Sequence, residues 1–142
     1  MWFERDKLIR FNHCDPAAII FYPQYFVLFH ELMEDWFNAA LDTNYGEYIR
    51  IARLGVPAVR ADCEFLSQSR LGDVVKFRLE PVRLGNSSLA FEGEAWGGDE
   101  LRARAQITVV QMSLESRRAV PFDARLRGNI EAYVRPAAPP SS

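Results

Sequence analysis

The stretch PQYFVLFHELMEDWFNAAL, residues 23–41, decides the fold because its apolar side chains recur with the period of a helix. At about 100° per residue, one polar sector collects Gln24, Glu31, Glu34, Asp35, Asn38 and Asp42. The opposite arc collects Phe26, Phe29, Met33, Trp36, Phe37 and Ala40, flanked by Tyr25, Leu32 and Leu41. Pro23 suits the first helical position, where an amide would have no intrahelical partner. The stretch predicts one long helix with a broad apolar face that a curved sheet can cover.

After Pro57 the apolar period changes to two, which is typical of strands with one buried face. Four such segments, 59–65, 75–80, 89–96 and 101–109, are separated by turn residues at 72–73, 85–86 and 97–99. Short connections predict an antiparallel meander. Residues 9–11 are strand-like, and short helices are expected over 45–54 and 124–134. The sequence therefore predicts an α+β fold in which a five-stranded antiparallel sheet packs around one long helix.

The length of 142 residues corresponds to one domain, expected over residues 1–135, with a disordered tail over 136–142. Hydrophobic residues make up 49% of the chain and charged residues 25%, the balance of a soluble globular protein. No apolar run approaches the roughly 20 residues of a membrane span. The first residues also lack the apolar core of a signal peptide. We therefore expect a cytoplasmic protein with no membrane partner.

Two cysteines are too few for a disulfide scaffold, and no zinc-like spacing accompanies them. A net charge of −2 argues against a nucleic-acid partner bound through a broad basic surface. The charge is uneven, however, because residues 101–142 hold seven arginines against Glu115, Asp123 and Glu131. Two interpretations of these arginines stand: a docking region for an anionic group such as a phosphate, and an ordinary solvated face.

Asp15 is the first candidate for chemistry, because Asp15-Pro16 breaks the chain just before the long helix. An ionised carboxylate at that point would attack a carbonyl group or activate water toward it. The alternative is an aspartate that only forms a turn or caps the helix. His13 lies two residues earlier, where a strand would place it on the same face as Asp15, so it either tunes the carboxylate or makes a local hydrogen bond.

Residues 10–26, RFNHCDPAAIIFYPQYF, resemble the active-site signature of the hotdog-fold 4-hydroxybenzoyl-CoA thioesterase family. The resemblance covers most of the chain and is densest over 10–37. It implies a hotdog fold, in which the sheet wraps around one long central helix, with Asp15 as the catalytic carboxylate. The backbone N–H of Tyr22 would polarise the thioester oxygen, a role that suits the unpaired amides of a helix start. The family usually has glycine where Ala18 stands, which matters if this residue needs a positive φ.

The same resemblance implies a set of substrate-binding residues. Ser67, Gln68 and Ser69 correspond to residues that face the site from a neighbouring subunit, and Arg83, Ser87 and Ser88 to residues near the nucleotide end of coenzyme A. Each of them also fits an ordinary turn or strand end. A second branch of hotdog thioesterases has its catalytic glutamate on the central helix, but Glu31 and Glu34 lie in the polar sector, where we expect them to be solvated.

The sequence thus predicts an acyl-CoA thioesterase that hydrolyses an aromatic or short acyl-CoA to the free acid and CoA. The resemblance implies a homodimer or a homotetramer with sites between subunits. No metal or cofactor is expected, since the chain has no glycine-rich phosphate loop, Gly-x-Ser-x-Gly, HExxH or Cys-x-x-Cys motif. Two alternatives remain. One is a non-catalytic hotdog module that binds acyl-CoA or an acyl carrier, an alternative that Ala18 keeps open. The other is an acyl-CoA hydratase, for which we find no strand-borne Asp and His pair.

Overall fold

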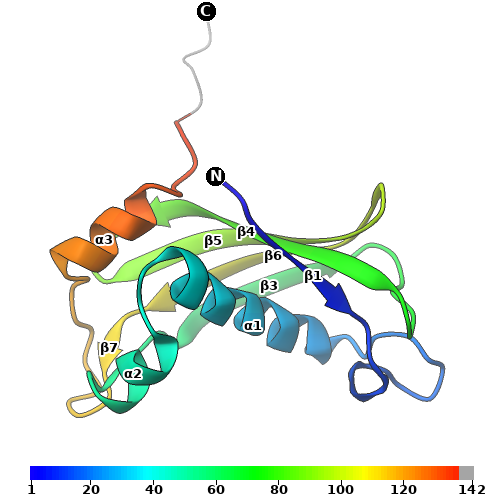
Figure 1. The fold of residues 1–142 in the computed structure, drawn as a ribbon, viewed down its shortest axis with the longest axis horizontal. Helices are drawn as coiled ribbons and strands as arrows, with labels where there is room; N and C mark the ends of the chain where they lie inside the picture. Colours follow the sequence, from blue (N-terminus) through cyan, green and yellow to red (C-terminus); the bar gives the residue numbers. More distant parts are fainter. Residues whose placement is uncertain (138–142) are drawn as a thin grey trace, which may run out of the picture.

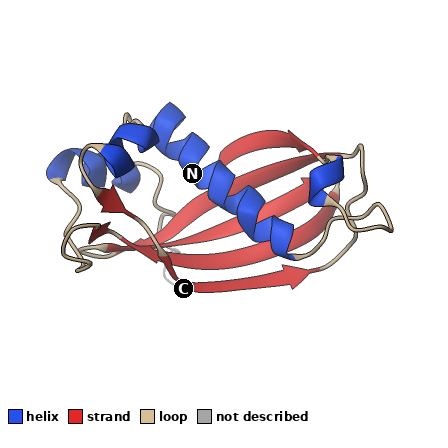
Figure 2. Cartoon of the chain, turned by 90° about the horizontal axis from the view of Figure 1, so that it is seen from below, coloured by secondary structure: helices blue, strands red, loops and turns tan. Residues whose placement is uncertain are grey.

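An 18-residue helix, α1 (Pro23–Ala40), lies across one face of a five-stranded antiparallel sheet (Figure 1 and Figure 2). The computed structural model describes residues 1–137. The sheet consists of β1 (Phe3–Leu8), β3 (Ala58–Phe65), β4 (Val74–Leu84), β5 (Ser88–Gly97) and β6 (Glu100–Val110). The smaller elements are η1 (Phe11–His13), α2 (Tyr45–Arg50), β2 (Leu54–Gly55), β7 (Met112–Ser113) and α3 (Ala124–Glu131).

The strands follow the order β1-β4-β5-β6-β3, which confirms five antiparallel strands but corrects their predicted neighbours. The meander holds for β4, β5 and β6. In contrast, β3 pairs with β6 at the far edge and not with β4. The reason is the connector over residues 66–73, which is too long for a tight hairpin and carries the chain across the end of the sheet.

The first strand was placed too late by the sequence pattern. It covers Phe3–Leu8, whereas residues 11–13, partly inside the predicted strand 9–11, form the 3-10 turn η1. Because β1 is an edge strand with mostly exposed side chains, its sequence shows little alternation. At its C-terminal end, α2 is four residues shorter than the predicted range 45–54, and α3 is three residues shorter than the predicted range 124–134. Most of the expected tail, residues 138–142, lies outside the described residues.

The core lies between α1 and the sheet. Leu28, Phe29, Leu32 and Trp36 of α1 are almost completely buried, and full burial of such side chains stabilises the fold by roughly 2–3 kcal/mol each. The ring of Phe29 meets the ring of Phe77 edge to face, with centroids 5.2 Å apart. Phe29 also lies directly over Gly93 of β5, where an added Cβ would be 2.6 Å from a ring carbon. A glycine is therefore what lets α1 approach the sheet this closely.

We predict that Gly93→Ala destabilises the fold by about 1–3 kcal/mol, because the new methyl group must displace the ring of Phe29. Urea unfolding followed by circular dichroism measures the change. Gly128→Ala is the matched control, since Gly128 lies in α3 with nothing within 4 Å of the added Cβ. This control should be stabilising by up to about 1 kcal/mol. Equal stability of Gly93→Ala and the parent chain would contradict the packing described here.

Candidate active site

The loop between η1 and α1 folds back on itself as a narrow hairpin that holds Asp15 close to the helix start. Cys14 pairs with Ile20 in an antiparallel bridge, and the Asp15 amide donates to the Ile19 carbonyl at 3.0 Å. The tip is closed by the Ala18 amide, which donates to the Asp15 carbonyl at 2.9 Å. The backbone of this one short hairpin therefore fixes Asp15 relative to the first residues of α1.

The carboxylate of Asp15 is half-buried and takes part in a local turn. Its Oδ1 accepts a hydrogen bond from the Ala17 amide at 2.8 Å. No other hydrogen bond to this carboxylate forms within residues 1–137. An ionised carboxylate accepts about four hydrogen bonds, so the turn leaves most of its acceptor capacity open. The interpretation of Asp15 as a turn-forming residue is thus correct, and its catalytic role stays a prediction.

Tyr22 is the N-cap residue of α1 and is followed by Pro23, which has no N–H. The amides of Gln24 and Tyr25 donate to the carbonyls of Phe21 and Tyr22. In the described part of the chain, the Tyr22 amide donates to no acceptor. The helix dipole adds positive potential at this position. The Tyr22 N–H is therefore a donor without a partner at the positive end of the helix dipole, where a negatively charged oxygen could be bound.

Ala18 adopts φ = 61°, the left-handed conformation in which an L side chain is strained. Contacts with neighbouring residues keep Ala18 in this strained conformation. The Leu71 amide donates to the Ala18 carbonyl at 2.9 Å, and Ile19 forms a bridge with Arg70. The position thus has the geometry for which glycine is suited, and this chain has alanine there.

We expect Ala18→Gly to stabilise the protein by about 1 kcal/mol. The left-handed conformation costs alanine about 1–2 kcal/mol, and the greater freedom of glycine in the unfolded chain offsets part of the gain. Thermal and urea unfolding give the difference. Ala17→Gly serves as the control, since Ala17 has no positive φ and should lose up to about 1 kcal/mol on the same change. A destabilised Ala18→Gly would refute the strain at this residue.

His13 and the cysteines take no visible part in the chemistry of Asp15. Because η1 is a 3-10 turn, His13 does not share a strand face with Asp15, and that expectation was wrong. Its Nδ1 instead accepts a hydrogen bond from the Arg10 amide at 2.9 Å. Burial raises the pKa of the Cys14 thiol, and the charge of Asp15 raises it further. Burial also raises the pKa of Cys63 to about 11. Both thiols therefore stay protonated near neutral pH, which makes them poor nucleophiles.

Residues 67–69 lie against the Asp15 hairpin of their own chain. The Ser67 hydroxyl donates to Glu100 at 2.9 Å, and Gln68 is exposed. Ser69 is only 1% exposed, with its hydroxyl 3.0 Å from that of Tyr25 and its carbonyl accepting from the Ile20 amide at 2.9 Å. The Ser69 side chain thus faces the protein interior, while Ser67 and Gln68 line an open polar hollow beside the hairpin.

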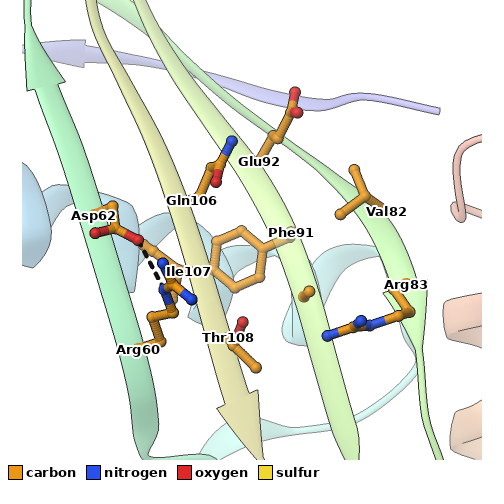
Figure 3. Close-up of a pocket in the computed structure, with 10 residues that line it drawn as sticks. Arg60, Asp62, Val82, Arg83, Phe91, Glu92, Gln106, Ile107 and Thr108 are labelled. Carbon is orange, nitrogen blue, oxygen red and sulfur yellow. Dashed lines mark hydrogen bonds and ion pairs between the residues drawn. The ribbon is translucent and has the colours of Figure 1, made fainter.

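Arg83, Ser87 and Ser88 lie at the opposite end of the molecule from Asp15. They flank the turn between β4 and β5, whereas the start of β4 adjoins the Asp15 hairpin. An 11-residue strand is about 35 Å long, so one chain does not bring the two groups together. Arg83 borders a hollow of about 350 Å³ on the sheet face turned away from α1, opposite Arg60 (Figure 3).

An apolar cavity of about 270 Å³, which sequence reasoning missed, lies between α1 and the β3 edge of the sheet. Its lining residues are Phe26, His30, Met33, Val56, Ala58, Ala61, Phe91, Ile107 and Val109. Tyr22, Phe26 and His30 are spaced four residues apart, so they share one side of α1 and lead from the free Tyr22 amide toward the cavity. His30 is the one polar side chain of this lining, and its Nε2 lies 2.8 Å from Glu34.

The arginines after residue 100 do not gather into one basic patch. Five of the seven form ion pairs within the chain: Arg102, Arg104, Arg125, Arg127 and Arg135. This distribution favours the interpretation of these arginines as part of an ordinary solvated face over their interpretation as an anion-docking region. Within residues 1–137, no group of His, Cys, Asp or Glu side chains is arranged as metal ligands would be. None of the described helices combines the length and hydropathy that crossing a membrane requires.

Residues 17–103, more than half of the chain, match the family model of the thioesterase superfamily. The match begins two residues after Asp15. No curated protein sequence matches the chain significantly.

Solved structures resemble the chain over nearly its whole length. Slr0204 from Synechocystis, a 1,4-dihydroxy-2-naphthoyl-CoA thioesterase, gives a TM-score of 0.84 at 20% identity, over 96% of this chain and 100% of that one. BH1999, a gentisyl-coenzyme A thioesterase, gives a TM-score of 0.80 at 22% identity, over 92% of this chain and 99% of that one. SAV2348 from Staphylococcus aureus, solved in complex with CoA, gives a TM-score of 0.84 at 17% identity, over 99% of this chain and 90% of that one. At these identities the likeness establishes the fold.

Proposed function

The chain belongs to the thioesterase superfamily and has the hotdog fold, and on this basis we propose that it hydrolyses an aromatic or short acyl-CoA to the free acid and CoA. One observation favours this activity above the others. A carboxylate with open acceptor positions, that of Asp15, lies on a short hairpin, and this hairpin leads directly into the start of α1, where the amide of Tyr22 is unpaired. In this proposal α1 is the central helix around which the sheet wraps.

Each of the two groups has a defined role in hydrolysis. The thioester carbonyl oxygen accepts from the Tyr22 amide, which stabilises the negative charge that develops there; one such donor typically lowers the barrier by about 3–4 kcal/mol. Asp15 then acts in one of two ways. As a nucleophile it forms a mixed anhydride and expels the CoA thiolate, and water later cleaves the anhydride. As a general base it removes a proton from the attacking water.

The apolar cavity beside α1 is the proposed site for the acyl group. It starts next to the side of α1 that carries Tyr22 and Phe26, so an acyl group whose carbonyl lies at the Tyr22 amide would point toward it. A volume of about 270 Å³ and an almost wholly apolar lining suit a single aromatic ring or a short aliphatic chain.

A homodimer completes the site in this proposal. β3 is an edge strand whose side chains are mostly exposed, including Val59 and Phe65. Such an edge offers unpaired backbone groups to a second strand. Two-fold pairing of β3 with its copy would bring opposite ends of two molecules together, so that Arg83, Ser87 and Ser88 of one subunit approach Asp15 of the other. These residues would then contact the CoA moiety. A homotetramer would be a pair of such dimers.

Asp15→Asn should lower kcat for thiol release by about 10²- to 10⁴-fold, because the amide can neither attack nor take a proton. A panel of aromatic and aliphatic acyl-CoAs, assayed with a thiol reagent, measures the rate and identifies the preferred acyl group. Asp99→Asn, a change at an exposed carboxylate in the turn between β5 and β6, is the control and should keep full activity.

Two outcomes would overturn the proposed hydrolysis. Tight binding of acyl-CoA without thiol release by the parent chain would assign the non-catalytic binding module. A product heavier than the substrate by one water, still attached to CoA, would assign a hydratase. Thiol release that is equally fast in Asp15→Asn would remove Asp15 from the mechanism.

The mass in solution tests the dimer. We expect at least twice the chain mass of 16.3 kDa, and Val59→Asp should shift the protein toward the monomer by placing a charge at the β3 edge. Val74→Asp is the matched control, because Val74 is comparably exposed, 60% against 64%, and lies on another strand. Sedimentation velocity at several concentrations resolves the species. A parent chain that stays monomeric at micromolar concentration would contradict the shared site.

A further inference from the structure

Arg102 of β6 is directed out of the regular strand pattern by a bulge. Ala95 pairs with Ala103 and Trp96 pairs with Leu101, so Arg102 is an extra residue without a cross-strand partner on β5. Bulges commonly redirect a side chain near a functional site. The Arg102 side chain is only 16% exposed, which is unusual for an arginine and calls for several partners.

The guanidinium of Arg102 binds three residues of the connector between β3 and β4. Its Nη1 donates to the Gln68 carbonyl at 2.7 Å and lies 3.4 Å from the Ser69 hydroxyl and 3.3 Å from Asp73 Oδ2. Glu100 Oε1 lies 2.6 Å from Nε as an ion-pair partner, although the direction is not that of a hydrogen bond. The Arg102 carbonyl also accepts from two amides of the connector, those of residues 66 and 67.

The connector in turn holds both halves of the candidate active site. On one side, the Ser69 carbonyl and the Leu71 amide bond to Ile20 and Ala18 of the Asp15 hairpin, each at 2.9 Å. On the other side, the Ser69 hydroxyl meets the hydroxyl of Tyr25, in the first turn of α1. Arg102 is thus linked through a single residue, Ser69, both to the loop that carries Asp15 and to the helix start that presents the Tyr22 amide.

Two further features show that the structure accommodates this guanidinium. A Cβ at Gly97 would overlap the guanidinium of Arg102. Because Gly97 has no side chain, the guanidinium can occupy this space. The Arg70 amide, together with Arg102, holds the pKa of Asp73 below its usual range, which keeps Asp73 ionised as a partner. A planar, permanently charged group with several donors can bind a carbonyl, a hydroxyl and a carboxylate at once.

We propose that Arg102 is a positioning residue: by bracing the connector over residues 67–73, it sets the distance between the Asp15 carboxylate and the Tyr22 amide. This inference rests on the proposed hydrolysis. Arg102 does not touch the reacting atoms, and its effect is transmitted through Ser69 to the hairpin and to α1. A misplacement of about 1 Å in such a pair costs up to about 100-fold in rate.

Kinetics of Arg102→Met, in the parent chain and in Asp15→Asn, test the assignment. In the parent chain we expect kcat to fall about 10- to 100-fold, with KM for the acyl-CoA changed less than threefold. In Asp15→Asn, where the pair no longer exists, the same change should cost less than twofold. A purely structural arginine would lower activity equally in both backgrounds. Arg104→Met, at a more exposed arginine of the same strand, is the control and should keep the parent kcat.

Gly97→Ala provides a second variant, because it displaces the guanidinium without removing it. It should reproduce the fall in kcat with the strand intact by circular dichroism, and it applies even if Arg102→Met folds poorly. Arg102→Lys keeps the charge but loses the planar fork, so its kcat should lie between those of the parent and Arg102→Met.

The outcomes separate this inference from the proposed function. If the parent chain hydrolyses thioesters and Asp15→Asn does not, the function stands. In that case unchanged kcat in Gly97→Ala and Arg102→Met, or an equal loss in both backgrounds, overturns the positioning role alone. If the parent chain releases no thiol, the function fails and the positioning role fails with it.

Discussion

The close contact between α1 and the sheet is the constraint on which the rest of the structure depends. Phe29 packs on Phe77 and directly over Gly93, so the absence of a side chain at Gly93 lets the helix lie close to the sheet. The helix begins at Pro23, with Tyr22 as its N-cap. The N-cap position leaves the Tyr22 amide unpaired in the described part of the chain, and the packing of α1 on the sheet sets the side of the helix that leads to the apolar cavity.

Elements with strong local patterns could be predicted from the sequence, and those that depend on distant partners could not. The α1 helix and the strands β4, β5 and β6 have regular apolar periods and clear turn residues between them. β1 is an edge strand without such a period. The position of β3 beside β6 goes with a connector, residues 66–73, that forms hydrogen bonds with residues distant in the sequence, among them Ala18, Ile20 and Arg102. Periodicity records which face is buried but not which strand is adjacent.

In the candidate site, too, features formed by consecutive residues could be predicted from the sequence, and features that depend on distant partners could not. Asp15 and Tyr22 could be proposed as candidates from the sequence because they lie in one run of consecutive residues, 10–26, whereas the partners of Ser69 come from α1 and β6. Arg102 looked like one of seven charges in a basic segment, and its bulge depends on how β5 and β6 align. The cavity between α1 and β3 has no sequence signature either, because its lining comes from separate elements and includes the incompletely buried Phe26.

The strained conformation of Ala18 is explained by the hydrogen bonds that surround it. A left-handed alanine costs about 1–2 kcal/mol and persists when its surroundings over-determine it. Here the Asp15 carbonyl and the Leu71 amide bind the two sides of Ala18, and the Leu71 segment is itself held by Arg102 through Ser69 and Asp73. The hairpin is therefore less free to relax than its exposed position suggests. In the proposed hydrolysis, a carboxylate on such a loop would keep its orientation before substrate binds, so that little reorganisation would remain for the reaction step.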